Sequence, residues 1–347
     1  MDRIFITGAS GFIGKALAIS LANSGTNVHV LVRASSNVEG LDHPNIKKFI
    51  GDIQNSKSIR DAMIGCDKVY HLAGLAKMWM KNKKSYHDVN VAGTLNVLSV
   101  AYKSGIDKIV FTSTGGVLPP ATDHPSNEFS QKRPELYTEY ERTKNRSEEI
   151  ALAFQEKGLP IVIVYPTKVF GPGPIGDCNT ATMMIRDYLN GKWKIIPGNG
   201  KGTMNYVYID DVIAGLISAM ERANSGSRYL LGGENASYDR FFSTVKKLTG
   251  VNRRLYHIPY PVIRSIAWFE DNRTKFFGAK PIITSEWVKK LRYNWSKDVT
   301  RANAELDLNP LSLEVGIRQT IDWLYQTNQV KIKPKVYKEV ITATSSL

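Results

Sequence analysis

The sequence predicts an α/β protein organised around a doubly wound parallel sheet. Short segments rich in Ile, Val and Phe alternate with segments of helical spacing through the first half of the chain, and this alternation is typical of βαβ units. The strand segments are nearly continuous apolar runs, as expected where helices cover both faces of a sheet. The first strand leads directly into a glycine-rich turn and a helix. We therefore expect parallel strands with helices on both sides.

Each element of this alternation has a local signal. Strand composition marks residues 3–7, 27–32, 47–50, 68–72, 108–113 and 161–166. Helical spacing covers residues 12–24, 56–64, 85–104 and 136–157. In the first of these helices Ile13, Leu17 and Leu21 share one face, and Gly25 ends the helix.

The alternation stops after about residue 170. Residues 171–176 and 197–202 are rich in Gly and Pro and are typical of loops. Helical patterns then dominate, over residues 211–223, 238–248, 261–269 and 311–326. We expect a Rossmann-type domain over residues 1–170, to which segments around 203–232 return. Residues 171–330 would form a smaller, mostly helical region, and residues 331–347 a basic, flexible tail.

Composition places the chain among globular proteins and excludes several other classes. Its 347 residues are 42% apolar and 22% charged, which excludes intrinsic disorder and collagen-like structure. Cys66 and Cys178 lie far apart without a Cys/His cluster, so we expect no metal site and a reducing, cytoplasmic compartment. The start lacks the apolar region of a signal peptide, and no apolar run reaches membrane-spanning length.

The net charge of +14 can favour anionic partners. The basic residues are spread along the chain, with small clusters at 81–84 and 331–338. A solvated basic surface explains most of this charge, and a phosphate-bearing ligand explains part of the remainder. A nucleotide-sensing or RNA-binding role is a remote alternative that the charge keeps open.

A glycine fingerprint joins the first strand to the first helix. Gly8, Gly11 and Gly14 have the spacing G-x-x-G-x-x-G. The first glycine permits a tight turn, the second lets the backbone approach a pyrophosphate, and the third lets the helix pack on the strand. Free N–H groups at the helix N-terminus can bind phosphate. In this strand–turn–helix context, the motif predicts a dinucleotide site.

The end of the second strand indicates which dinucleotide is bound. NAD-binding folds place an acidic residue about 20 positions after the glycines, where it bonds the ribose 2′-hydroxyl. Here that position is Arg33, followed closely by Ser35 and Ser36. An arginine beside hydroxyl groups suits a 2′-phosphate. We therefore expect NADP(H), with NAD(H) as the alternative. If Arg33 has no role in cofactor binding, it is simply a surface arginine after a strand.

A Tyr-x-x-x-Lys pair lies within the helical segment 136–157. Tyr140 and Lys144 are four residues apart, so their side chains share one helix face. A neighbouring ammonium group stabilises a phenolate and lowers the tyrosine pKa from its usual value near 10. Upstream, Thr112, Ser113 and Thr114 follow a predicted parallel strand, and ligands bind at the carboxyl ends of such strands.

With these motifs in place, the chain resembles an extended short-chain dehydrogenase/reductase of the NAD-dependent epimerase/dehydratase superfamily. The matching segments are residues 7–14, 51–53, 71–74, 90–94, 112–114, 140–144, 166–173 and 207–212, in family order over nearly the whole chain. The resemblance implies that Tyr140 donates or accepts the proton, that Lys144 holds the nicotinamide ribose and lowers the Tyr140 pKa, and that Thr114 is the catalytic hydroxyl. Ser113 is its rival, and Asn90 matches a structural or proton-relay asparagine.

The same motifs assign the cofactor contacts. Together they are Gly8, Ser10, Gly11, Phe12, Ile13, Gly14, Arg33, Ser36, Asp52, Ile53, Leu72, Ala73, Gly74, Thr112, Tyr140, Lys144, Pro166, Thr167 and Val169. The resemblance places Asp52 and Ile53 at the adenine, Ala73 and Gly74 along the cofactor channel, and 166–169 beside the nicotinamide.

Two branches of the superfamily compete for this chain. Nucleotide-sugar epimerases and dehydratases keep NAD bound, whereas members that resemble dihydroflavonol 4-reductase and 3β-hydroxysteroid dehydrogenase exchange cofactor and interconvert a carbonyl and an alcohol. Arg33, Lys168 in place of the usual Asn, and the bulky apolar stretch 75–80 favour the second branch. We expect an NADP(H)-dependent oxidoreductase acting on a fairly apolar carbonyl or alcohol, with Lys77, Trp79, Met183, Met184, Met204 and Tyr206 as substrate-pocket candidates or ordinary core.

Partners other than a small molecule have weaker signals. Trp268, Phe269, Phe276 and Phe277 are best explained by burial in C-terminal helices, with a membrane-contacting surface as the less favoured explanation. The intact Tyr140/Lys144 pair argues against a nucleic-acid-binding relative. The oligomeric state stays open, although the family often dimerises through a four-helix bundle, for which the helices near 85–104 and 136–157 are candidates.

Overall fold

The computed structural model describes residues 3–131 and 135–331. Its central feature is a seven-stranded sheet in the order β10-β6-β5-β4-β1-β2-β3, and every pairing in it is parallel. The strands are β1 (Arg3–Thr7), β2 (Asn27–Val32), β3 (Ile46–Ile50), β4 (Lys68–His71), β5 (Lys108–Thr112), β6 (Ile161–Pro166) and β10 (Arg228–Leu231). The predicted doubly wound parallel sheet is therefore confirmed.

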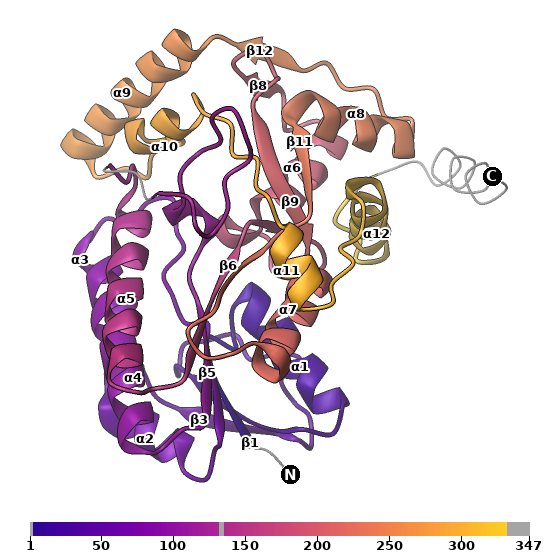
Figure 1. The fold of residues 1–347 in the computed structure, drawn as a ribbon. Coiled ribbons are helices and arrows are strands. Elements are labelled where there is room, and N and C mark those ends of the chain that lie inside the picture. Colours follow the sequence, from indigo (N-terminus) through magenta and orange to yellow (C-terminus); the bar gives the residue numbers. More distant parts are fainter. Residues whose placement is uncertain (1–2, 132–134, 332–347) are drawn as a thin grey trace, which may run out of the picture.

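Helices cover both faces of this sheet (Figure 1). One side carries α1 (Phe12–Asn23) and α7 (Ile209–Arg222), and the other carries α2 (Ser56–Met63), α4 (Gly93–Lys103) and α5 (Glu139–Glu156). A hydrophobic core lies on each face of the sheet, and successive side chains of β1 point into opposite cores. Ile4 and Ile6 pack in the core beneath α1 and α7, whereas Phe5 packs in the core beneath α2, α4 and α5. This explains why the strands are apolar along their whole length.

The predicted helix over residues 85–104 is not uniform. It consists of α3 (Lys84–Tyr86), a π-helical turn η1 (His87–Ala92) and α4. Within that turn the carbonyl oxygen of Asn90 accepts hydrogen bonds from the hydroxyls of Thr94 and Ser147, each at 2.6 Å. Side-chain donors thus satisfy a carbonyl group at the point where the α-helical ladder is interrupted.

The second half of the chain lies above the carboxyl ends of the central strands (Figure 1). It contains the three-stranded sheet β11-β9-β7 and the two-stranded sheet β12-β8, formed by β7 (Lys168–Phe170), β8 (Ile195–Pro197), β9 (Thr203–Tyr208), β11 (Glu234–Ser237) and β12 (Tyr256–Ile258). The helices there are α6 (Thr180–Leu189), α8 (Tyr238–Thr249), α9 (Tyr260–Phe277), α10 (Ser285–Lys290), α11 (Thr300–Glu305) and α12 (Leu313–Gln326), with the short 3₁₀ turn η3 (Asp177–Asn179). A second short turn, η2 (Gly115–Val117), follows β5 in the first half.

Several of these elements differ from the expectation. The helix expected over 261–269 continues to Phe277, where Gly278 ends it in the left-handed conformation at φ 65°. The three-residue strands β7, β8 and β12 and the six-residue helices α10 and α11 are too short to produce a clear periodic pattern in the sequence. The chain returns to the central sheet through β10, which pairs with β6. The basic tail expected from residue 331 lies, from 332 onward, outside the described residues.

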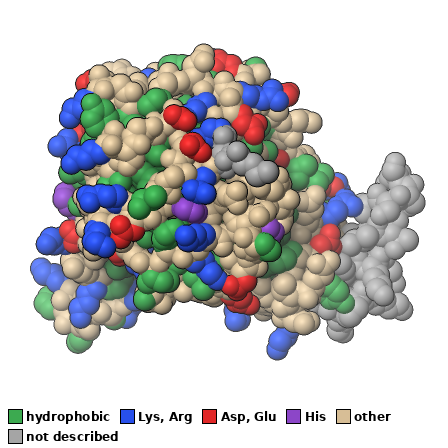
Figure 2. Space-filling model, turned by 90° about the horizontal axis from the view of Figure 1, so that it is seen from below, with side chains coloured by type: hydrophobic (Ala, Val, Ile, Leu, Met, Phe, Trp, Pro, Cys, Tyr) green, Lys and Arg blue, Asp and Glu red, His purple; other side chains and the backbone are tan. Residues whose placement is uncertain are grey.

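The outer edge of the second half is formed by α9 and α10. The two helices pack on each other through a small separate cluster of Ile263, Ala267 and Val288, and they lie together at the top of the molecule in Figure 1. Within the described part of the chain, none of the helices is both apolar and long enough to span a bilayer. On the face shown in Figure 2, Lys and Arg side chains are scattered with Asp and Glu between them.

Candidate active site

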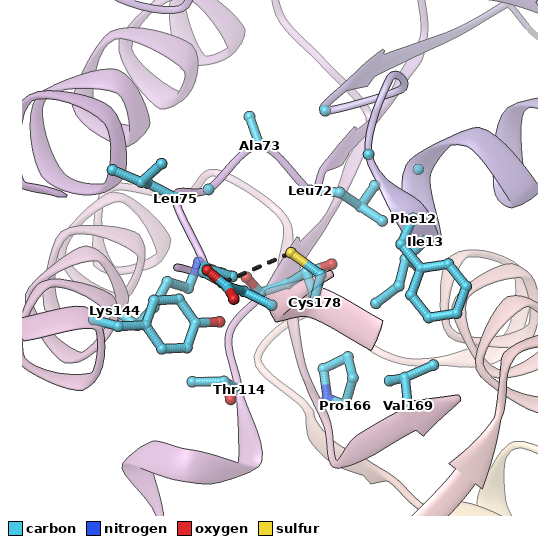
Figure 3. A pocket seen from close by; sticks show the side chains of 18 of the residues that line it. Phe12, Ile13, Leu72, Ala73, Leu75, Thr114, Lys144, Pro166, Val169 and Cys178 are labelled. Carbon is cyan, nitrogen blue, oxygen red and sulfur yellow. Dashed lines mark hydrogen bonds between the residues drawn. The ribbon is translucent and has the colours of Figure 1, made fainter. Parts of the chain in front are cut away.

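A large cavity of about 610 Å³ opens at the carboxyl ends of the central strands. The glycine-rich turn, the ends of β2 to β6 and the N-terminal part of α5 form its walls. Figure 3 shows Phe12 and Ile13 near one end, and Thr114 and Lys144 near the other. One continuous space therefore connects the glycine fingerprint to the tyrosine–lysine pair.

The glycines of the turn are required by close approach of the backbone. Gly8 has φ +78°, and a Cβ atom there would lie 2.7 Å from the backbone nitrogen of Ala73. A Cβ atom on Gly14 would overlap the carbonyl oxygen of Gly8. The N–H of Gly11 donates to that same carbonyl at 2.9 Å. The turn thus presents bare backbone and the start of α1 to the cavity, a geometry suited to a pyrophosphate.

Every residue that the sequence assigns to the cofactor lines this cavity. Among these residues, Arg33 is exposed where β2 ends, and Ser10 donates to the hydroxyl of Ser36 at 3.4 Å. Asp52 and Ile53 lie beside them in the same wall. The residues present, a basic side chain with hydroxyls and a tight glycine cradle, fit a nicotinamide dinucleotide.

A buried histidine supports the glycine turn from below. The side chain of His71 is fully buried and bridges Thr7 and Thr94, with ring nitrogens 2.7 Å and 2.9 Å from the two hydroxyls. The hydroxyl of Thr7 also accepts from the N–H of Ala73 at 3.2 Å. Burial lowers the pKa of His71 to about 3, and the nearby charge of Lys144 acts in the same direction. The imidazole is therefore neutral and structural.

Helix α5 carries both members of the tyrosine–lysine pair. It begins at Thr138, whose hydroxyl accepts from the N–H of Glu141 while the Glu141 carboxylate accepts from the N–H of Thr138. Lys144 Nζ donates to the carbonyl oxygen of Thr112 at 2.7 Å and lies 4.7 Å from the Phe111 ring centre. Burial lowers the pKa of Lys144 to about 8, and the charge of Glu148 partly offsets this effect.

Tyr140 faces the same end of the cavity, beside Thr114. Burial raises the pKa of Tyr140, the charge of Cys178 adds to the rise, and a hydrogen bond with Thr114 lowers it. This differs from the expectation that Lys144 lowers the Tyr140 pKa, because removal of the phenol from water is the larger effect here. Tyr140 is consequently protonated at neutral pH.

The structure separates the two hydroxyl candidates. Both residues line the cavity, but the hydroxyl of Ser113, a buried residue, donates to Glu148 at 3.3 Å, whereas the hydroxyl of Thr114 forms a hydrogen bond with Tyr140. Asn90 is fully buried behind the site. Its Oδ1 accepts from the N–H of Leu75 at 2.7 Å, and its Nδ2 donates to Thr143 at 2.9 Å. Asn90 thus joins the loop after β4 to α5.

The substrate-pocket candidates are only partly brought together. Lys77 and Met204 line the main cavity, and Trp79 lines a neighbouring cavity of about 410 Å³ that also reaches Lys77 and Tyr140. Tyr206 is instead a core residue, stacked on Phe241 at 4.8 Å between ring centres. Met184 is buried with it, and Met183, on α6, lines neither cavity. Tyr206 and Met184 differ from the expectation because the faces of β9 and α6 that carry them pack into the hydrophobic core and not toward the cavity.

The main cavity is also lined by residues that the sequence interpretation did not place there. They are Lys168, Asp177, Cys178, Thr180, Asn205, Trp287, Lys290, Trp295 and Lys297. Trp287 and Lys290 belong to α10, where Lys290 forms an ion pair with Glu141 and lies 4.8 Å from the ring centres of Trp287 and Trp295. Trp287 and Lys290 are too far from Tyr140 in the sequence to form a local motif with it. Lys168 enters the sequence interpretation only as a departure from the usual Asn.

Lys168 is a lysine in the cavity wall with a neutral partner. Its Nζ donates to the hydroxyl of Thr180 at 3.0 Å, and among the described residues no carboxylate forms an ion pair with it. Burial and the neighbouring charge of Lys290 lower its pKa to about 8. A positive charge that the protein leaves uncompensated favours an anionic group on the ligand.

Comparison with known proteins agrees with this geometry. Residues 4–232 match the model of the NAD dependent epimerase/dehydratase family. The chain is 29% identical to a putative dihydroflavonol 4-reductase of Synechocystis sp., covering 95% of this chain and 96% of that protein. It is 29% identical to sterol demethylase protein B of Methylococcus capsulatus, covering 94% and 99%. It is 28% identical to the human sterol-4-alpha-carboxylate 3-dehydrogenase, decarboxylating, covering 74% and 69%.

Solved structures share the fold. The crystal structure of gox2253 superposes with a TM-score of 0.83 at 27% identity, covering 95% of this chain and 100% of that one. A UDP-glucuronic acid 4-epimerase from Bacillus cereus, solved with NAD, superposes with a TM-score of 0.76 at 23% identity, covering 94% and 99%. The chain therefore belongs to the NAD dependent epimerase/dehydratase family and is an enzyme of the extended short-chain dehydrogenase/reductase superfamily.

Proposed function

We propose that the protein is an NADP(H)-dependent oxidoreductase that interconverts a ketone or aldehyde and an alcohol on a fairly apolar small molecule. The observation that carries the proposal is the single cavity that joins the glycine turn and Arg33 to Thr114, Tyr140 and Lys144. The apolar walls around Leu75, Met204, Trp287 and Trp295 suit an apolar substrate. The neutral, buried His71 supports the cofactor turn without taking part in the chemistry.

A nicotinamide cofactor held in this cavity would supply or receive the hydride. The hydroxyl of Thr114 would donate a hydrogen bond to the substrate oxygen and orient the carbonyl. Tyr140, which is protonated at neutral pH, would give its proton to that oxygen in the direction of reduction. Lys144, held against the end of β5, would hold the ribose of the cofactor.

Arg33 supports the choice of NADP(H). It lies at the end of β2, exposed in the adenine end of the cavity, where its guanidinium group can form charge-assisted hydrogen bonds with a 2′-phosphate. Ser10 and Ser36 add hydroxyls at the same point. Among the described residues Arg33 has no ion pair with an acidic side chain, so its charge is available to the cofactor.

Lys168 supports a substrate that carries an acidic group near the reacting carbon. Its ammonium group lies in the cavity with Thr180 as its hydrogen-bond partner. One relative is named for a sterol-4-alpha-carboxylate, a molecule that combines an apolar skeleton with a carboxylate. An apolar hydroxy acid, oxidised at the neighbouring carbinol, suits both features of this cavity.

The direct test is turnover of a panel of apolar ketones and hydroxy acids by the purified protein with NADPH or NADP. We expect activity that Tyr140→Phe lowers by a factor of about 10² to 10⁴ while cofactor binding persists. A nucleotide-sugar epimerase or dehydratase is the second candidate, favoured by the fold shared with UDP-sugar enzymes. Purified protein that retains stoichiometric NAD, and that turns over a UDP-sugar without net redox change, would favour the second candidate over the first.

The small-molecule substrate is one partner, and a second copy of the chain is another. We infer a homodimer through α4 and α5, which pack side by side on one face of the sheet. Leu95 and Tyr102 on α4 are 46% and 48% exposed, which leaves apolar surface for a partner helix. A mass of twice the chain in analytical ultracentrifugation, reduced to one chain by Leu95→Glu, is the expected result.

A further inference from the structure

The helix α9 exposes a row of large apolar side chains to solvent. Val262, Ile266, Phe269, Phe276 and Phe277 occupy one side of the helix, as their spacing of about one or two turns requires. Phe269 is 60% exposed, Phe276 73% and Phe277 82%. Trp268, 65% exposed, lies next to this row. We call these six residues the α9 face, and their exposure contradicts the favoured expectation that the aromatic pairs are buried.

The opposite side of α9 faces the protein. Ile263 and Ala267 are buried against Val288 of α10. The two acidic residues of the helix are held inward: Glu270 binds Arg273 at 2.7 Å and accepts from the N–H of Ile282 at 2.8 Å. Asp271 accepts from the N–H of Ser285 at 3.1 Å. The helix is therefore anchored on one side, and none of the residues that the structure describes covers its apolar outer side.

The exposed charged residues of α9 itself are positive. They are Arg264 and Lys275, and Lys280 follows the helix at its C-terminal end. Just after α10, Arg292 is also exposed, while the exposed Lys289 of α10 forms an ion pair with Glu135. An amphipathic helix with aromatic residues on one side and basic residues beside them is the arrangement that binds at a lipid–water interface.

We propose that the α9 face docks on the surface of a membrane that contains anionic lipids. The aromatic side chains enter the boundary between headgroups and acyl chains, and the basic residues contact the headgroup phosphates. Neither contact requires a membrane-spanning segment. The hollow formed by Phe269, Asn272, Arg273, Phe276, Phe277 and Ala279, about 380 Å³ in volume, gives the surface room for part of an acyl chain.

Charge favours a lipid surface over a second copy of this chain. A twofold symmetric contact brings the same patch of both subunits together, so the positive charges of Arg264, Lys275 and Lys280 from both subunits would gather at one interface. The net charge of +14 adds to this repulsion. An anionic membrane surface has the opposite sign and attracts the same residues.

The position of α9 relates the docking surface to the active site. The cavity of about 410 Å³ is lined by Asp271, Thr274 and Lys275 of α9, and it shares Lys77 and Tyr140 with the main cavity. An apolar substrate dissolved in the bilayer would thus reach Tyr140 beneath the helix that contacts the membrane. This role in substrate delivery rests on the proposed function, whereas the docking itself does not.

The test is co-sedimentation of the full chain with phosphatidylcholine vesicles, with and without phosphatidylglycerol. We expect binding that increases with the anionic lipid and decreases with added salt. The double variant Phe276→Ser/Phe277→Ser should weaken it at least about tenfold, because two exposed rings no longer enter the interface. The variant Arg264→Glu/Lys275→Glu should bind phosphatidylglycerol vesicles as weakly as pure phosphatidylcholine.

The matched control is Ile50→Ser/Ile64→Ser, which removes apolar side chains that are 68% and 65% exposed on the central domain. This control should bind as the unchanged protein does. Protein that stays in the supernatant with every vesicle, or equal binding of the phenylalanine variant, overturns the proposal. Self-association that this variant abolishes, without vesicle binding, assigns the face to a second copy. NADPH affinity and turnover, measured on the same variants, report on the proposed function separately.

Discussion

Lys144 Nζ donates a hydrogen bond of 2.7 Å to the carbonyl oxygen of Thr112, and this bond ties α5 to the end of β5. Thr114 follows two residues after the acceptor, and Tyr140 precedes the donor by one helical turn. The bond therefore helps to hold Thr114 and Tyr140 in the wall of the same cavity.

Tyr140→Phe should lower kcat by a factor of about 10² to 10⁴, the usual contribution of a general acid. The phenyl ring keeps the shape of the site but has no proton to give. NADPH affinity, followed by fluorescence titration, should stay unchanged. Tyr256→Phe is the matched control, because Tyr256 is 46% exposed on β12 and lines neither cavity. Equal turnover by Tyr140→Phe and the unchanged enzyme would contradict the mechanism.

Cofactor affinity should weaken as the pH rises through about 8. Burial lowers the pKa of Lys144 to about 8. The side chain is therefore protonated well below that pH and loses its charge above it. The ribose hydroxyls and phosphates of the cofactor prefer the charged form. Titrations with NADPH between pH 7 and pH 9 should show this loss, and Lys144→Met should bind weakly with little pH dependence. Lys168→Met, at the substrate end, should keep the dependence of the unchanged protein.

Arg33→Ser should weaken NADPH binding by about tenfold to a hundredfold, since hydrogen bonds to a charged group contribute about 1.5 to 3 kcal/mol. NADH binding should hardly change, because NADH has no 2′-phosphate. Arg60→Ser removes an exposed arginine that lies outside the cavity and serves as the control. A protein that prefers NADH before any mutation would refute the assignment of Arg33.

Lys168→Met should raise KM for an apolar β-hydroxy acid by about tenfold, because the ion pair with the substrate carboxylate is lost. The methyl ester of the same acid has no charge, so its KM should change little. The comparison of acid and ester within one variant separates loss of recognition from loss of folding. If acid and ester are affected equally, Lys168 does not recognise an anionic group.

His71 should make the protein less stable as the pH falls below about 6.5. Its pKa is about 3 in the folded protein and 6.5 ordinarily, so between these values the unfolded chain binds a proton that the folded chain excludes. Stability from this source is complete above pH 6.5 and is lost toward pH 3. Urea denaturation at pH 7 and pH 5 should differ by about 2 kcal/mol, and His71→Asn should lose less over this range. The same loss in both proteins would exclude His71 as the cause.

The sequence by itself determined the features that local chemistry dictates. The glycine turn is visible in the sequence because its backbone contacts leave no room for a Cβ atom, as at Gly8 against Ala73, so only glycine fits there. The pairing of Tyr140 with Lys144 follows from helical periodicity. The parallel sheet followed from apolar runs that alternate with helices. Each of these signals is contained in a few neighbouring residues, so a single sequence is enough to recognise it.

Only the tertiary structure decided which side chains share a cavity and which face solvent. Tyr206 was a pocket candidate and lies in the core, while Lys290 and Trp287 reach the cavity from α10. Phe276 and Phe277 have the composition of buried residues, yet they are exposed because α9 packs on α10 through its other side. Long-range packing sets these outcomes, since the burial of a side chain depends on the elements that cover it and not on its own neighbours in the chain.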